Sequence, residues 1–404
     1  MRARITLLLL FAILFSFTCL AQTNFEKHFT KKSLRIDFAL SGNWDFQAAA
    51  IQQLREEPVW AGPVKNLIDP FGYGGYYINV YDKAGKELIY SRGFNTLFEE
   101  WRSTEQAKTE TQSWTNSISI PYPKAPVIIE ITARDKADMQ FHLLLKQEID
   151  PASIFIDRGK LKENRITKIQ YNGDSSGKVD LVFLAEGYTA DEQEKFVADA
   201  KRFTEALFKT PPYDTRREDF NIWAVDAVSE ESGTDVSGKG IFKNTALNSG
   251  YYTFGVDRYL TTPDMKSIRD AVWNAPCDAI FILVNTDAYG GGGMYNFYAM
   301  GTADNPRTPV VFVHEFGHFI AAKACGVKVN EFSIGMGPAF FKRQRGETLY
   351  SLRILPIGGF CAMEGEDEDS EDERAFNNKP AWQRAIVLAA GAFMNLLTAV
   401  ILMI

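Results

Sequence analysis

The sequence predicts an α+β multidomain protein, with an N-terminal β-sandwich, an α/β domain and a short C-terminal part that ends in a transmembrane helix. Three observations predict this order. Residues 25–149 hold short β-branched and aromatic runs between turn-rich segments, which favours a sandwich. After Pro151, strands alternate with amphipathic helices, as in an α/β domain. Residues 385–404 form an uncharged apolar run that is long enough to cross a bilayer.

Composition supports a globular chain and excludes one class of partner. Of the 404 residues, 46% are hydrophobic and 24% are charged, which is typical of globular proteins. The formal net charge is −7, and residues 364–374 alone carry eight acids and one arginine, so the remainder is neutral overall. Because there is no basic excess, we expect no nucleic-acid partner.

Residues 1–21 have the order of a secretory signal peptide, with basic residues, an apolar run and small residues before Gln22. We therefore expect cleavage after Ala21 and export to the periplasm or the cell surface. Acylation of Cys19, as in a lipoprotein, is the second interpretation. An uncleaved anchor ranks below both because the run is shorter than about 20 residues. The three cysteines that would remain predict no disulfide framework.

Residues 22–150 are expected to form the β-sandwich. We expect their aromatic side chains to lie in the core, with a binding face as the alternative. The strand candidates are SLRIDFALSG, GGYYINVYDK, ELIYSRGF, SWTNSISI, PVIIEITARD and MQFHLLLKQEI.

Residues 151–318 are expected to form the α/β domain. Thr189 and Glu192 make a capping box at the start of a helix over residues 190–208, whose apolar stripe is Phe196, Ala200, Phe203 and Leu207. Four glycines at 290–293, after Tyr289, are interpreted as a flexible loop whose backbone approaches another group closely. The remaining expected elements are strands at 179–185, 220–228, 278–285 and 309–313 and a helix near 264–273.

One short motif carries chemistry. His314, Glu315 and His318 form the pattern H-E-x-x-H after a β-run. On a helix, residues i and i+4 share a face, so the two histidines can present imidazole nitrogens to one zinc ion. Glu315 lies beside them and can act as general base toward a water molecule. The alternative interpretation is a pair of surface histidines on an ordinary helix.

A zinc site of this kind needs a third protein ligand, and the sequence leaves it open. No histidine follows His318. Glu331 and Cys325 are candidates, although neither has a characteristic spacing. His28 and His142 fall in the β-rich region and are expected to be structural or exposed.

Residues 25–318 resemble the IgA-peptidase family of secreted bacterial zinc metallopeptidases, including its N-terminal β-rich domain. The resemblance implies a zincin-like fold for residues 151–318, with His314 and His318 as zinc ligands, Glu315 as the catalytic glutamate, and residues 289–293 as a candidate cleft loop. It departs after His318, where the chain reads FIAAKACG. The segments that carry it are DLVFLAEGYTADE, EDFNIWAVDAVSEESGTD, FGVDRYL, CDAIFILVNTDAYGGGGMYNFYA and VFVHEFGH.

Residues 314–404 are similar to a second family, the site-2 intramembrane proteases. This resemblance implies a metal-binding helix, a membrane-associated β-hairpin within residues 319–384, and a transmembrane segment at 385–404. His314, His318 and Glu315 would keep the same roles, while the family's third ligand, an aspartate, would fall beyond Ile404. The segments that carry it are HEFGHFIAAKACGVKVNEFSIGMGP and LYSLRILPIGGFCAMEGEDEDSEDERAFNNKPAWQRAIVLAAGAFMNLLTA.

The two resemblances meet at the peptide HEFGH, which indicates a chimera, either a gene fusion or two genes joined in assembly. Topology supports this interpretation. A signal peptide places the N-terminal domains outside, whereas Lys379 and Arg384 beside the apolar helix favour a cytoplasmic position. The chain stops inside the apolar stretch, as expected of a truncation.

Three functions follow in order of expectation. The first is an exported, membrane-associated zinc metalloendopeptidase that acts on a protein or peptide substrate. The second is a site-2-type intramembrane protease, which would place the chain in a bacterial membrane. The third is an inactive fusion that serves only as a secreted binding protein, because the site lacks a third ligand.

Overall fold

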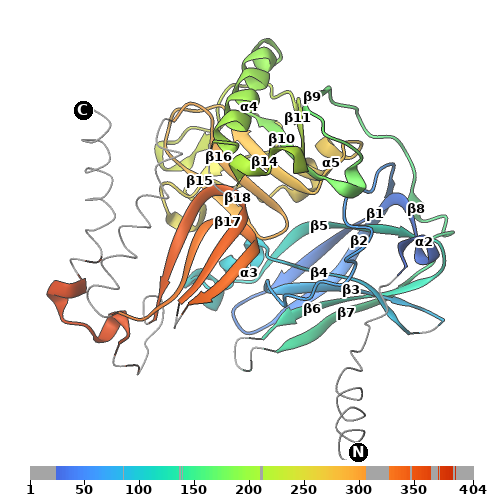
Figure 1. Ribbon diagram of the computed structural model, residues 1–404, viewed down its shortest axis with the longest axis horizontal. Helices are drawn as coiled ribbons and strands as arrows, with labels where there is room; N and C mark the ends of the chain where they lie inside the picture. The colour runs from blue at the N-terminus through green and yellow to red at the C-terminus, as the bar shows by residue number, and fades with distance from the viewer. Residues whose placement is uncertain are drawn as a thin grey trace, which may run out of the picture.

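The computed structural model describes most of the chain up to Asn305 and part of the remainder (Figure 1). The described residues are 24–84, 86–135, 138, 140–209, 213–305, 327–345, 348–364, 372, 374–384 and 387.

The N-terminal region is a β-sandwich, as the alternating runs predict (Figure 1). One sheet has the order β5-β1-β2-β8 and the other has the order β4-β3-β6-β7. The elements are α2 (Phe25–His28), β1 (Phe29–Gly42), β2 (Gln47–Glu57), β3 (Tyr76–Asp82), β4 (Leu88–Phe94), α3 (Leu97–Trp101), β5 (Gln112–Pro123), β6 (Val127–Arg134), β7 (Phe141–Ile149) and β8 (Ile156–Asp157).

Alternating side chains close the space between these two sheets. Successive residues of a strand point to opposite faces, so Ile36 and Phe38 of β1 share one face. Both are fully buried and belong to the same apolar cluster as Ile78 of β3 and Ile131 of β6. The aromatic residues of this region lie mainly in that core, which agrees with the structural interpretation of its composition.

The second region is built on a six-stranded sheet of order β15-β16-β14-β10-β11-β9. The four inner strands run parallel, and both edge strands, β15 and β9, run antiparallel to their neighbours. The elements are β9 (Ile166–Gln170), β10 (Val179–Glu186), α4 (Gln193–Leu207), β11 (Phe220–Val225), the short pair β12 (Asp235–Val236) and β13 (Gly250–Tyr251), α5 (Met265–Val272), β14 (Ala279–Val284), β15 (Gly291–Met294) and β16 (Tyr298–Thr302).

Pleat alternation along β10 explains how this sheet is covered on both faces. Leu181 and Phe183 pack in one cluster with the apolar stripe of α4, whereas Val182 and Leu184 belong to the cluster that contains the sandwich core and α5. The helices α4 and α5 therefore lie on opposite faces of the sheet (Figure 1). The sandwich and the sheet share one continuous apolar core.

Several predicted elements of this region are found, with adjusted ends. The predicted capping box is present, because the Thr189 side chain accepts from the Glu192 amide and the Glu192 side chain accepts from the Thr189 amide. The strand expected at 220–228 ends at Val225, because Ala227 turns back to donate to the Val225 carbonyl at 3.1 Å. The strand expected at 309–313 lies outside the described residues.

The C-terminal part contains a long antiparallel hairpin of β17 (Val329–Arg345) and β18 (Thr348–Met363). A small apolar cluster that includes Val329, Phe332 and Met363 joins its open end. Within the described residues, no helix is both long and apolar enough to cross a membrane. The predicted signal peptide lies outside the described residues, as does the predicted transmembrane segment at 385–404 except for Val387.

Candidate functional site

The motif residues His314, Glu315 and His318 lie outside the described residues, and so does Cys325. Glu331 lies in β17, and only its backbone is described. Among the described residues, no group of three His, Cys, Asp or Glu side chains could hold a metal ion. The assignment of these residues as zinc ligands and catalytic base therefore stays a prediction from the sequence.

The structure does describe the edge of the sheet from which the chain continues toward this motif. The parallel strands β10, β14 and β16 end at this edge, and in open α/β sheets ligands bind at the carboxyl ends of the strands. After β16, Ala303 donates to the Val284 carbonyl at 2.9 Å and Asp304 donates to the Thr286 carbonyl at 3.2 Å. These bonds fix the backbone up to Asp304, ten residues before His314.

A cluster of charged side chains on α4 holds the same point of the chain. The Lys195 ammonium donates to Asn285 Oδ1 at 2.9 Å and to both carboxylate oxygens of Asp304 at 3.0 and 3.1 Å. Arg202 donates to the Ala303 carbonyl and to Asp199, each at 2.7 Å. Two cations of one helix thus clamp the end of β16.

Asp199 lies at the centre of this cluster and is 7% exposed. Burial favours its neutral form, but hydrogen bonds from Arg202, Lys195 and Tyr188 outweigh burial and hold the pKa of Asp199 below its ordinary value. This carboxylate stays charged at neutral pH. It serves as an anchor for the two cations.

Glu186, the last residue of β10, is fully buried and organises a neighbouring loop. Its carboxylate accepts from the Thr245 hydroxyl at 2.7 Å and from the backbone amides of Leu247 and Ser249 at 2.9 Å each. Burial raises the pKa of Glu186, and these three donors oppose the rise. Both carboxylate oxygens of Glu186 thus accept hydrogen bonds from the loop at 245–249, which Glu186 supports.

The turn after β10 also has the geometry that its glycine requires. Gly187 has φ +70°, which L side chains rarely adopt, and a Cβ there would lie 1.9 Å from the Gly233 carbonyl oxygen. The chain therefore bends at Gly187, directly after β10.

The glycine stretch after Tyr289 is not the flexible loop that the sequence suggested. Residues Gly291–Met294 form the edge strand β15, which pairs antiparallel with β16. Its glycines permit close approach, since a Cβ on Gly290 would lie 2.3 Å from the Tyr251 ring and one on Gly292 would lie 2.5 Å from the Leu260 carbonyl oxygen. The predicted close approach of the backbone is confirmed. The predicted loop is wrong, because glycine carries no side-chain pattern from which a strand could be recognised.

The outer edge of β15 is partly occupied by the segment that precedes it. Leu260 donates to the Gly291 carbonyl, and Gly291 donates to the Arg258 carbonyl, each at 3.3 Å. The same segment contains Tyr252 and Phe254 with φ of +68° and +53°, which is strained backbone for aromatic residues. The role of residues 289–293 as a cleft loop stays a prediction.

Sequence reasoning missed the charged clamp formed by Lys195, Arg202 and Asp304. Lysine and arginine on an amphipathic helix are usually solvated, and nothing in their spacing marked these two as partners of a chain segment about 100 residues later. The only signal was their position on α4, directly after the turn that ends β10.

Comparison with known proteins gives three family matches. Residues 167–330 match IgA Peptidase M64, residues 24–144 match the Peptidase M64 N-terminus, and residues 308–404 match Peptidase family M50. The first and third matches overlap at 308–330, which includes HEFGH. The two resemblances seen in the sequence are thus confirmed, and so is their meeting point.

Curated relatives match about a quarter of the chain. A protein of Clostridium perfringens is 54% identical over 95 residues and one of Fusobacterium nucleatum is 53% identical over 94 residues; both names provisionally describe zinc metalloproteases. A chloroplastic membrane metalloprotease of Arabidopsis thaliana is 42% identical over 96 residues. These matches cover 24%, 23% and 23% of this chain and 28%, 28% and 22% of the relatives, so the chain spans only about a quarter of their length.

Proposed function

We propose that this chain is a zinc-dependent metallopeptidase that is exported and associates with a membrane through residues 385–404. The single observation that carries the proposal is that His314, Glu315 and His318 lie in the overlap of two peptidase family matches. Two imidazoles spaced four residues apart are a donor set that zinc takes readily, whereas the third ligand is not identified. The substrate would be a protein or a peptide.

In this proposal each motif residue has a distinct role. His314 and His318 would hold the metal, which when bound would supply a Lewis acid that makes water a usable nucleophile near neutral pH. Glu315 accepts the proton of the attacking water and passes it to the leaving amine of the cleaved peptide bond. Asp304, clamped by Lys195, fixes the backbone ten residues upstream of His314.

Zinc content tests this proposal directly. The purified full chain is expected to hold one zinc ion, His314→Ala is expected to lose it, and Glu315→Gln is expected to keep it. His142→Ala is the matched control, because His142 is an exposed residue of β7 that pairs with Asp138. Zinc that persists in both His314→Ala and His318→Ala would contradict the ligand assignment.

A second candidate function is intramembrane proteolysis. It is favoured by the match of residues 308–404 to Peptidase family M50 and by the hairpin of β17 and β18, which that resemblance implies. Parallel assays separate the two functions. Cleavage of an unstructured soluble polypeptide favours the first, and cleavage restricted to a transmembrane substrate in lipid vesicles favours the second.

A further inference from the structure

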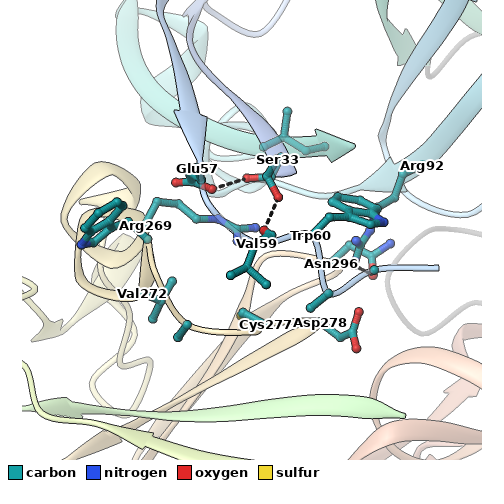
Figure 2. Close-up of a pocket in the computed structure, with 16 residues that line it drawn as sticks. Ser33, Glu57, Val59, Trp60, Arg92, Arg269, Val272, Cys277, Asp278 and Asn296 are labelled. Carbon is teal, nitrogen blue, oxygen red and sulfur yellow. Dashed lines mark hydrogen bonds between the residues drawn. The ribbon is translucent and has the colours of Figure 1, made fainter. Parts of the chain in front are cut away.

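A small polar cavity lies between the N-terminal sandwich and the α/β region (Figure 2). Its volume is about 40 Å³, which is room for roughly three water molecules. Glu57, Trp60 and Arg92 line it from the sandwich, and Arg269 and Asp278 line it from the α/β region. The cavity thus brings two acids and two arginines together inside the shared core.

Glu57 is the last residue of β2 and is 6% exposed. Its Oε2 accepts from the Ser119 hydroxyl of β5 at 3.3 Å. Its Oε1 lies 3.8 Å from Arg35 Nη1 and has no hydrogen-bond partner among the described residues. Burial raises the pKa of Glu57 to about 7. The positive charges of Arg35 and Arg269 lower this pKa, whereas the negative charge of Asp37 raises it further.

Asp278 faces the cavity from the residue before β14. Its Oδ2 accepts from the backbone amide of Asp180 at 2.9 Å. Burial raises the pKa of Asp278 to about 7; the Asp180 carboxylate adds to the rise and Arg92 opposes it. Tyr90 and Cys277 are the other titratable groups that interact with Asp278.

Arg269 extends from α5 into the cavity on the side of Glu57 (Figure 2). Its Nε is buried and has no hydrogen-bond partner among the described residues. Burial lowers the pKa of Arg269, although Cys277 and Glu57 oppose this. A buried guanidinium and a buried carboxyl that face one space without a direct bond leave that space for bridging water.

We propose that docking of the N-terminal sandwich on the α/β region is proton-linked, with Glu57 and Asp278 taking up protons as the two parts close over this cavity. A buried carboxylate without sufficient partners costs free energy, and protonation removes that cost. The proposal concerns the joint between the two parts and is independent of the proposed peptidase activity.

The direction of the pH effect on docking follows from the ordinary pKa of each acid and its raised pKa in the docked state. Glu57 shifts from 4.5 to about 7 and Asp278 from 3.8 to about 7, so the docked state holds more protons between these values. Docking is strongest at a pH below the ordinary pKa of each acid, and it weakens as the pH rises through about 7. Between pH 5.5 and 8.5 the docking equilibrium is expected to fall on the order of 30-fold for each carboxyl.

Amide hydrogen exchange of the full chain measures this effect where it occurs. After correction for the intrinsic pH dependence of exchange, residues 57–61 and 275–280 are expected to lose protection between pH 5.5 and 8.5. Glu57→Gln keeps the shape of the protonated carboxyl and cannot ionise. This variant is expected to remove about half of the pH-dependent loss of protection, measured on a logarithmic scale. Asp278→Asn alone gives the same test should Glu57→Gln fold poorly, and the double variant is expected to show no pH dependence.

Glu56→Gln is the matched control, because Glu56 precedes Glu57 on β2 and pairs with Lys32 and Arg158 on the outer side. Partial burial opposes the effect of these cations, but they hold the pKa of Glu56 below its ordinary value. This variant should therefore retain the pH dependence of the wild-type joint. The proposal is overturned if protection in the wild type is the same at both pH values, or if Glu57→Gln and Glu56→Gln respond alike.

Discussion

The strongest single test of the joint between the two regions is the removal of Arg35. This side chain is fully buried on β1, where its guanidinium donates to both oxygens of Asp37 at 2.7 and 3.0 Å, to Ser117 at 3.1 Å and to Asp270 of α5 at 2.6 Å. It therefore ties the sandwich to the helix that covers the sheet.

Replacing Arg35 by methionine keeps much of its apolar stem and removes the charge. Asp270 retains a second partner in Lys266, but Asp37 is 2% exposed and would lose its only ion-pair partner among the described residues. Breaking a buried pair from one side costs about 3–5 kcal/mol, and we expect a loss of that order in the free energy of unfolding.

Equilibrium unfolding in urea measures the loss, with Arg216→Met as control. The Arg216 side chain is 61% exposed and pairs with Asp219 three residues later, so its loss is expected to cost less than about 1 kcal/mol. Adding Asp37→Asn to Arg35→Met should recover part of the stability, because it removes the stranded charge. Equal effects of the two arginine variants would refute the reasoning.

Three further predictions concern the sheet and its edge. Phe281→Ala should lower the free energy of unfolding by about 3–5 kcal/mol, since the ring is 1% exposed and packs edge-on against Phe183, whereas Ile154→Ala, at an 86% exposed side chain, should change it little. Gly292→Ala should lower the thermal unfolding midpoint because its Cβ would lie 2.5 Å from the Leu260 carbonyl oxygen, and the neighbouring Gly293→Ala, with no contact under 3.4 Å, should be tolerated; equal midpoints would contradict this account of β15. Lys195→Met should speed amide exchange at residues 303–305 while exchange in β11 stays unchanged, and unaltered exchange at both places would mean that the clamp does not hold the end of β16.

The sequence was most informative where side-chain pattern and local chemistry agree. The apolar run at 181–185 of β10 and the capping box of Thr189 and Glu192 each have one simple physical interpretation, and the structure contains both. Alternation along β1 and β6 likewise predicted the sandwich.

Features that depend on distant residues could not be predicted in the same way. Alternation places Arg35 on the face of β1 opposite the sandwich core, where solvent is the usual neighbour, yet α5 covers that face and brings Asp270 to the guanidinium. The strand β15 is mostly glycine, so its pairing is decided by the backbone of β16. Both features come from tertiary contacts that leave no local pattern.

Paired peptidase rates of the wild type and Glu315→Gln test the central claim most directly. With the zinc content of both proteins measured in the same samples, the account predicts a fall in kcat/KM of about 10²–10⁴-fold for Glu315→Gln while zinc is retained. An unchanged rate, or a rate lost only together with zinc, would contradict the role of Glu315 as the proton acceptor.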